Sequence, residues 1–110
     1  MLARAARLRT AEEFRTTMRR GVRCGRPSLV LHMLRTDNPP SRAGFVVSKA
    51  VGNAVTRNRV KRQLRHLVAA RLAHVPFELD VVVRALPHTG GVAADLDSAW
   101  TAATERLASS

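Results

Sequence analysis

The sequence predicts an α+β fold, a two-layer sandwich in which three helices cover one mostly antiparallel sheet. Three features indicate this fold: a helix-capping motif near the N-terminus, a run of alternating apolar residues typical of strands, and two longer segments with helical periodicity. The 110 residues are enough for one domain, and because 45% of them are hydrophobic the chain can bury a core. The expected order is helix, two or three strands, helix, strand, helix.

The first predicted element is a helix over residues 11–20. Thr10 followed by Glu13 has the form of a capping box, in which each side chain accepts a hydrogen bond from the backbone N–H of the other residue. Phe14 and Met18 are four residues apart and therefore share one face of this helix.

Two strands should follow the first helix. Apolar residues alternate over 28–34, a second strand-like run covers 42–48, and turn-forming residues at 37–41 separate the two runs. This pattern predicts that the two strands pair as an antiparallel hairpin.

The second half of the chain predicts a helix, a strand and a helix. Asn53 can cap a helix that runs to Leu72, and the β-branched residues 81–83 indicate a central strand over 79–85. The last helix presents one apolar face, formed by Leu96, Ala99, Trp100, Ala103 and Leu107.

Positive charge is concentrated in the first two thirds of the chain. Nineteen Lys and Arg oppose eight Asp and Glu, which gives a formal net charge of +11, and Asp37 is the one acid in residues 14–77. Residues 78–110 reverse the balance, with five acids against two Arg. Such a surface repels itself unless a polyanion neutralises it, and nucleic acid is the strongest polyanion in a cell. We expect a single RNA-binding domain over 1–110, with a short basic arm at 1–8 and frayed residues at 109–110.

The lack of an apolar targeting segment and the single cysteine predict a cytoplasmic protein. No apolar run approaches the roughly 20 residues that cross a bilayer, and the N-terminal residues lack the apolar centre of a signal peptide. Cys24 is the single cysteine, so an internal disulfide and a cysteine-based metal cluster are excluded, and we interpret Cys24 as a packing residue.

The densest functional motif lies at residues 57–65, in the second predicted helix. Six of its nine residues can donate hydrogen bonds to phosphate oxygens or base edges: Arg57, Asn58, Arg59, Lys61, Arg62 and Arg65. A solvated helix normally intersperses Glu with Lys or Arg, but no carboxylate lies within one turn of this motif. Nucleic-acid contact is the favoured interpretation, and a basic solvated face is the alternative.

Residues 48–65, Ser-Lys-Ala-Val-Gly-Asn-Ala-Val-Thr-Arg-Asn-Arg-Val-Lys-Arg-Gln-Leu-Arg, resemble the signature of the bacterial ribonuclease P protein subunit with its Arg-Asn-Arg motif. A looser resemblance extends from Arg7 to Leu107, almost the whole chain. The resemblance implies a fold like domain 2 of ribosomal protein S5, in which an uncommon left-handed crossover joins the strands on either side of the second helix.

Members of that family are accessory subunits of a ribonucleoprotein that removes the 5′ leader from precursor tRNA by hydrolysis. The resemblance therefore implies ribonuclease P RNA and precursor tRNA as partners, no obligate protein partner and no membrane, and it implies that the catalytic site and its Mg²⁺ ions belong to the RNA. The residues agree, because the basic segment lacks the clustered carboxylates of a protein metal nuclease and the four His show no ligand spacing. We expect no catalytic residue and no metal site in this chain.

The resemblance also implies two RNA sites. The six residues of the 57–65 motif would dock on the RNA subunit. The single-stranded leader would lie in a cleft between the first helix and the sheet, where aromatic stacking and positive charge hold single strands. The matching cleft positions are Phe14, Met18, His32, Lys49 and Arg84, with Met18 and His32 in place of aromatic residues that members often carry. Phe14 and Met18 also suit a role in the core.

Two other functions stay open on the sequence. A small ribosomal or other structural RNA-binding protein would have a similar size and charge. An autonomous nuclease would need a metal site, for which Glu78 and Asp80, two residues apart on one strand face, are the available pair. Pairs of this kind more often solvate the end of a strand.

Overall fold

A computed structural model describes residues 4–87 and 90–109, within which the chain forms three α-helices and a four-stranded mixed sheet. The helices are α1 (Ala11–Arg20), α2 (Ala54–Leu72) and α3 (Val92–Ala108), and short 3-10 turns η1 (Arg4–Ala6) and η2 (Lys49–Val51) precede α1 and α2. The strands are β1 (Val22–Gly25), β2 (Leu29–Thr36), β3 (Arg42–Val46) and β4 (Glu78–Ala85). The predicted α+β class and element order are confirmed, with β1 as the optional extra strand. His88 and parts of the predicted arm and frayed end, residues 1–3 and 110, lie outside the described residues.

The strand order is β1-β2-β4-β3, with β3 parallel to β4 and the other neighbours antiparallel. The predicted hairpin between residues 28–34 and 42–48 is therefore wrong, because β4 lies between β2 and β3. Residues 79–83 of β4 are all buried, so this strand needs cover on both faces, whereas β3 is short and partly exposed and lies at the edge. Turn residues show where a chain changes direction, but burial decides which strand takes the centre.

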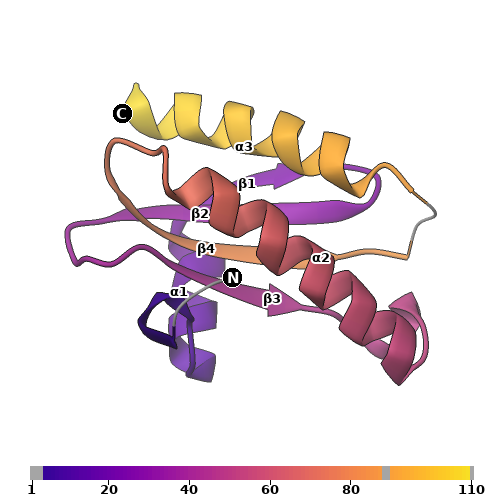
Figure 1. Cartoon of the computed structure of the whole chain (residues 1–110). Helices are drawn as coiled ribbons and strands as arrows, with labels where there is room; N and C mark the ends of the chain where they lie inside the picture. The colour runs from indigo at the N-terminus through magenta and orange to yellow at the C-terminus, as the bar shows by residue number, and fades with distance from the viewer. Residues whose placement is uncertain (1–3, 88–89, 110) are drawn as a thin grey trace.

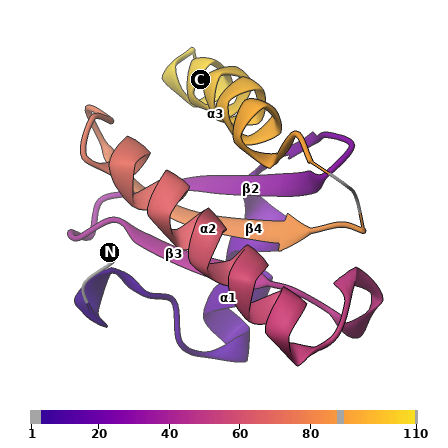
Figure 2. The same cartoon turned by 45° about the vertical axis from the view of Figure 1, so that its right-hand side comes forward.

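The helices lie on both faces of the sheet (Figure 1 and Figure 2). α2 and α3 cover one face, while α1 packs against β2 and β4 from the other face. The main core lies under α2 and α3 and contains alternate residues of the central strands, such as Leu31 and Val83, with Leu64 and Trp100 from the helices. The intervening strand residues face α1, which places His32 under that helix.

Local hydrogen bonds explain where α1 and α2 begin. Thr10 and Glu13 form the predicted capping box: Oγ1 of Thr10 accepts from the N–H of Glu13 at 3.1 Å, and Oε1 of Glu13 accepts from the N–H of Thr10 at 2.9 Å. Oδ1 of Asn53 accepts from the N–H of Thr56 at 2.9 Å and so caps α2 as predicted.

The parallel strands β3 and β4 are joined by η2 and α2, which lies over one face of the sheet in Figure 1. This connection is consistent with the left-handed crossover and the S5-like fold that the resemblance implies. Across residues 4–87 and 90–109, the helices are too short or too polar for any of them to traverse a bilayer.

Candidate RNA-binding surfaces

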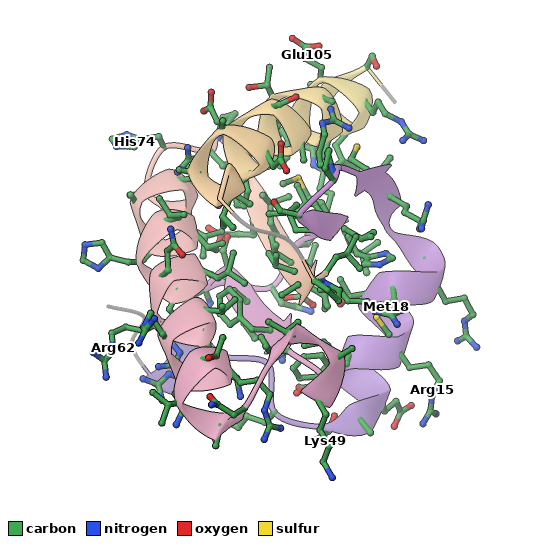
Figure 3. The ribbon with its side chains drawn as sticks, turned by 90° about the vertical axis from the view of Figure 1, so that its right-hand side faces the viewer. Arg15, Met18, Lys49, Arg62, His74 and Glu105 are labelled. Carbon is green, nitrogen blue, oxygen red and sulfur yellow. The ribbon has the colours of Figure 1, made fainter. Side chains whose placement is uncertain are left out.

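The outward side of α2 carries most of the predicted RNA-binding residues. Leu64 and Val68 are fully buried and turn one side of α2 towards the sheet, which leaves the other side in solvent. Five motif residues lie on the exposed side or are half-buried along its edge: Asn58, Arg59, Lys61, Arg62 and Arg65. Figure 3 shows Arg62 pointing away from the sheet. We call these five residues the α2 basic face.

Arg57 lies apart from the α2 basic face. It is seven residues before Leu64, which is almost two full turns, and so it lies on the side of the helix that faces the sheet. Its Nε atom is buried and has no hydrogen-bond partner among the described residues. Arg57 is half-buried, as is Lys61 one turn later, whereas Asn58, Arg59 and Arg62 are exposed.

The α2 basic face has no carboxylate partner in the part of the chain that the structure describes. Within residues 4–87 and 90–109, no ion pair includes a residue of the 57–65 motif. At the other end of α2, by contrast, Arg71 pairs with Asp97 of α3 at 3.2 Å. The unpaired cations leave a concentrated positive field on one exposed helix surface.

A hollow of about 470 Å³ lies on the same surface. Its lining combines guanidinium, amide and imidazole groups with one apolar side chain: Arg59, Arg62, Gln63, His66 and Leu67. Nucleotides offer phosphate oxygens, polar base edges and apolar ring faces, and this lining can contact all three.

The five predicted leader-cleft residues come from four elements. Phe14 and Met18 lie on α1, His32 on β2, Arg84 on β4 and Lys49 in η2. Lys49 is exposed and lies at the end of the sheet, between α1 and α2 (Figure 3). The structure brings His32 and the exposed Arg84 together on the face of the sheet that α1 covers, while Lys49 lies at the margin.

β1 adds a cation that the sequence analysis did not identify. In the sheet register Arg23 lies opposite His32, and Arg84 lies opposite Val30, two residues along on the same face. Burial lowers the pKa of His32, and the charges of Arg23 and Arg84 lower it further. His32 is buried, and its Nδ1 has no hydrogen-bond partner in the part of the chain that the structure describes. We call Arg23, His32 and Arg84 the α1-side basic cluster.

A short alternation in the sequence could have revealed Arg23. Val22 and Cys24 are apolar and flank it, which is the pattern of a half-buried strand, but the run is only four residues long. Cys24 is buried, in agreement with its interpretation as a packing residue.

Phe14 and Met18 differ in burial. Phe14 is half-buried, and its ring lies so close to Gly44 of β3 that a Cβ at residue 44 would overlap it. Met18 is 36% exposed, and Figure 3 shows it on the side of α1 that faces the sheet. The core role therefore fits Phe14 in part, whereas Met18 leaves an apolar side chain in solvent.

The two acids considered as a metal pair have other partners. Asp80 is buried and accepts from Nε and Nη2 of Arg42, at 3.0 and 2.9 Å. Glu78 accepts from the Ser41 hydroxyl at 2.8 Å. For Asp80 the interpretation as a solvated strand end is therefore wrong. Within the described ranges, no group of three or more His, Cys, Asp or Glu is placed to hold a metal ion.

Comparisons with known proteins identify the family of this chain. The family model for Ribonuclease P matches residues 2–107. The "Ribonuclease P protein component" of Streptomyces griseus is 53% identical over 113 residues, which covers 90% of this chain and 92% of that protein. The protein of the same name from Kocuria rhizophila is 54% identical over 87 residues, which covers 79% of this chain and 77% of that protein.

Solved structures have the same fold. The RNase P protein of Staphylococcus aureus superposes with a TM-score of 0.73 at 22% identity, covering 94% of this chain and 96% of that one. The RNase P protein of Thermotoga maritima gives a TM-score of 0.64 at 25% identity, covering 94% and 92%. The matched residues, the relatives and the fold together show that this chain belongs to the ribonuclease P protein family.

Proposed function

We propose that this chain is the protein subunit of a ribonuclease P ribonucleoprotein. It binds the catalytic RNA and the 5′ leader of precursor tRNA, and it promotes the endonucleolytic removal of the leader in the cytoplasm. The observation that carries this proposal is the α2 basic face, whose cations form no ion pair with a carboxylate among the described residues, on a chain of this family.

The α2 basic face suits docking on the folded RNA subunit. Leu64 and Val68 anchor the helix in the core, so the outward cations stand on a rigid support with regular spacing. Each guanidinium can hold a phosphate with two donors, and each phosphate that is neutralised releases bound counterions. Affinity for the RNA should therefore be strong at low salt and fall steeply as salt is added.

The α1 side of the sheet suits the single-stranded leader. Arg23 and Arg84 supply positive charge for the backbone, and Phe14 and Met18 supply surfaces for bases. Only Phe14 offers an accessible flat ring, because the His32 ring is buried, so charge should contribute more than stacking to leader binding.

Bond cleavage is assigned to the RNA. Glu13 and Asp80, two carboxylates on the α1 side, are bound by Arg42, and the described residues hold no group of three or more His, Cys, Asp or Glu placed to bind a metal ion. The protein's part is to hold the two RNAs together and to offset the repulsion between their phosphates.

Reconstitution with a bacterial ribonuclease P RNA at low Mg²⁺ tests the proposal. We expect the RNA alone to cleave precursor tRNA poorly and the added chain to restore leader removal, because its cations replace part of the ionic screening. Treatment of the assembled enzyme with micrococcal nuclease should abolish the activity. Absence of any stimulation contradicts the proposal, and activity that survives the nuclease places the catalyst in the protein.

A further inference from the structure

Three charged side chains tie α1 to the sheet. Glu13 lies in the first turn of α1, Arg42 begins β3, and Asp80 lies in β4. Nη1 of Arg42 donates to Oε2 of Glu13 at 2.6 Å, while its Nε and Nη2 donate to the two carboxylate oxygens of Asp80 at 3.0 and 2.9 Å. One guanidinium thus joins one helix to two strands.

Every carboxylate oxygen in this network has a donor. Oε1 of Glu13 accepts from the N–H groups of Arg9 and Thr10 at 2.7 and 2.9 Å. The N–H groups of Thr10 and Arg9, and then Arg42, lower the pKa of Glu13 to about 2. Asp80, and then Glu13, raise the pKa of Arg42, so Glu13 and Arg42 both stay charged at neutral pH.

The network is partly shielded from solvent. The side chains of Arg42 and Glu13 are 33% and 29% exposed, and that of Asp80 is 11% exposed. Pairs in this environment are screened less by salt than pairs on the open surface. The bidentate contact with Asp80 also fixes the plane of the guanidinium, and so fixes where Glu13 binds.

Other contacts also hold α1 in place, because it packs against β2 and β4. Thr17 is the one fully covered residue of α1. The ring of Phe14 rests on Gly44, which follows Arg42 by two residues on the same strand. Phe14 also follows Glu13 directly in sequence, so the ion pair and the ring contact attach the same turn of α1 to β3.

We propose that the Glu13–Arg42–Asp80 network positions α1 over the α1-side basic cluster and thereby sets the shape of the leader cleft. This inference rests on the proposed function, which places the leader between α1 and the sheet. Glu13 and Asp80 would repel a phosphate, so they act through Arg42 and α1 rather than by touching the leader. They are positioning residues.

The test measures how strongly the holoenzyme binds two precursor tRNAs, one with a long leader and one with a minimal leader. Glu13→Gln removes the charge that Arg42 binds and keeps the shape of the side chain. We expect this variant to weaken binding of the long-leader substrate about tenfold and of the minimal-leader substrate less than about twofold. Affinity for the RNA subunit should not change, because the α2 basic face is untouched.

A matched control breaks a comparable pair elsewhere. Asp97→Asn removes the Arg71–Asp97 pair, which also joins two elements but lies away from α1, and it should leave both substrates unaffected. Arg42→Lys keeps the positive charge but loses the planar guanidinium that binds two carboxylates, so it should cause an intermediate loss of affinity for the long-leader substrate. Thermal unfolding followed by circular dichroism reports whether each variant folds. If Glu13→Gln does not fold, Arg42→Lys takes its place in the binding measurements.

The outcomes separate this inference from the proposed function. If the unmodified holoenzyme prefers the long leader and the variants lose affinity for both substrates equally, or for neither, the positioning role is overturned while the leader cleft stands. If the unmodified holoenzyme does not distinguish the two leaders, the leader cleft is wrong and the positioning role fails with it.

Discussion

The α2 basic face and the α1-side basic cluster are both positive, but they are assembled differently. The five residues of the α2 basic face belong to one helix and one stretch of nine residues. The α1-side basic cluster takes one residue from each of β1, β2 and β4, which are far apart in the sequence. The α2 basic face is exposed or half-buried along its edge, whereas the α1-side basic cluster combines the buried His32 with two exposed Arg residues.

This difference shows which kind of binding site can be identified from the sequence alone. Helical spacing fixes which residues share a face, so the α2 basic face is visible in the sequence. Neighbours across a sheet depend on strand order and register, which no local pattern determines. RNA binding by the α2 basic face should be most sensitive to the removal of charge. Leader binding at the α1-side basic cluster should be most sensitive to changes in the position of α1.

The largest expected effect comes from removing charge on α2. The Arg57→Ala, Arg59→Ala, Arg62→Ala triple variant should lower the slope of log affinity against log salt by about 0.7 to 0.9 per lost phosphate contact, and weaken RNA binding about a hundredfold at low salt. Filter binding over a salt titration measures both quantities. Arg71→Ala, at the far end of α2, serves as the control.

Single variants sharpen this prediction. Because Arg57 faces the sheet and Arg62 faces solvent, Arg62→Ala should change the salt slope more than Arg57→Ala. If the triple variant keeps the slope of log affinity against log salt, the α2 basic face does not contact the RNA.

A smaller effect is expected from crowding the contact between α1 and β3. In Gly44→Ala the new Cβ overlaps the Phe14 ring, so the ring must turn or α1 must move away. We expect a loss of about 1 to 3 kcal/mol in the free energy of unfolding, measured with urea, and a weaker preference for long leaders. A variant as stable as the parent would show that α1 does not pack tightly on Gly44.

A gain of function is expected from restoring an aromatic ring. Met18→Phe should strengthen binding of a long-leader precursor about fivefold, because stacking of one base on an aromatic side chain contributes about 1 kcal/mol or more. Equilibrium binding of long-leader and minimal-leader substrates measures the change. An equal gain with both substrates would mean that residue 18 does not contact the leader.

The smallest expected effect concerns pH. The pKa of His32 is lowered in the folded protein, so the unfolded chain binds the proton more readily. The contribution of neutral His32 to stability is therefore complete above the unfolded pKa of about 6.5, and it is lost as the pH falls from there through the lowered folded value. The decrease in melting temperature from pH 7.5 to pH 5.5 should be larger for the parent than for His32→Phe. Identical pH dependence in the two proteins would contradict the burial of this imidazole.

The local parts of the fold could be predicted from the sequence. The capping residues Thr10 and Asn53 place the starts of α1 and α2 correctly, because a cap depends on neighbours within one turn. The apolar face of the last helix, including Leu96 and Trp100, is also buried as predicted.

The non-local parts could not be predicted in this way. The turn at 37–41 suggested a hairpin, but the insertion of β4 between β2 and β3 depends on a strand that occurs some forty residues later. For the same reason no local pattern in the sequence pairs Arg42 with Asp80, although the register places them side by side. The site residues remain predictions on both surfaces until binding is measured.

Cleavage of RNA by a hydroxyl-radical reagent tethered to single cysteines tests most directly whether α2 lies against the RNA subunit. In a Cys24→Ala background, the sites are Val55→Cys on α2, Met18→Cys on α1 and Thr101→Cys on α3, all at exposed positions. We expect a reagent at residue 55 to cleave the RNA subunit and a reagent at residue 18 to cleave the leader. A reagent at residue 101 should cleave neither RNA. Cleavage of the RNA subunit from residue 101 and not from residue 55 would contradict this expectation.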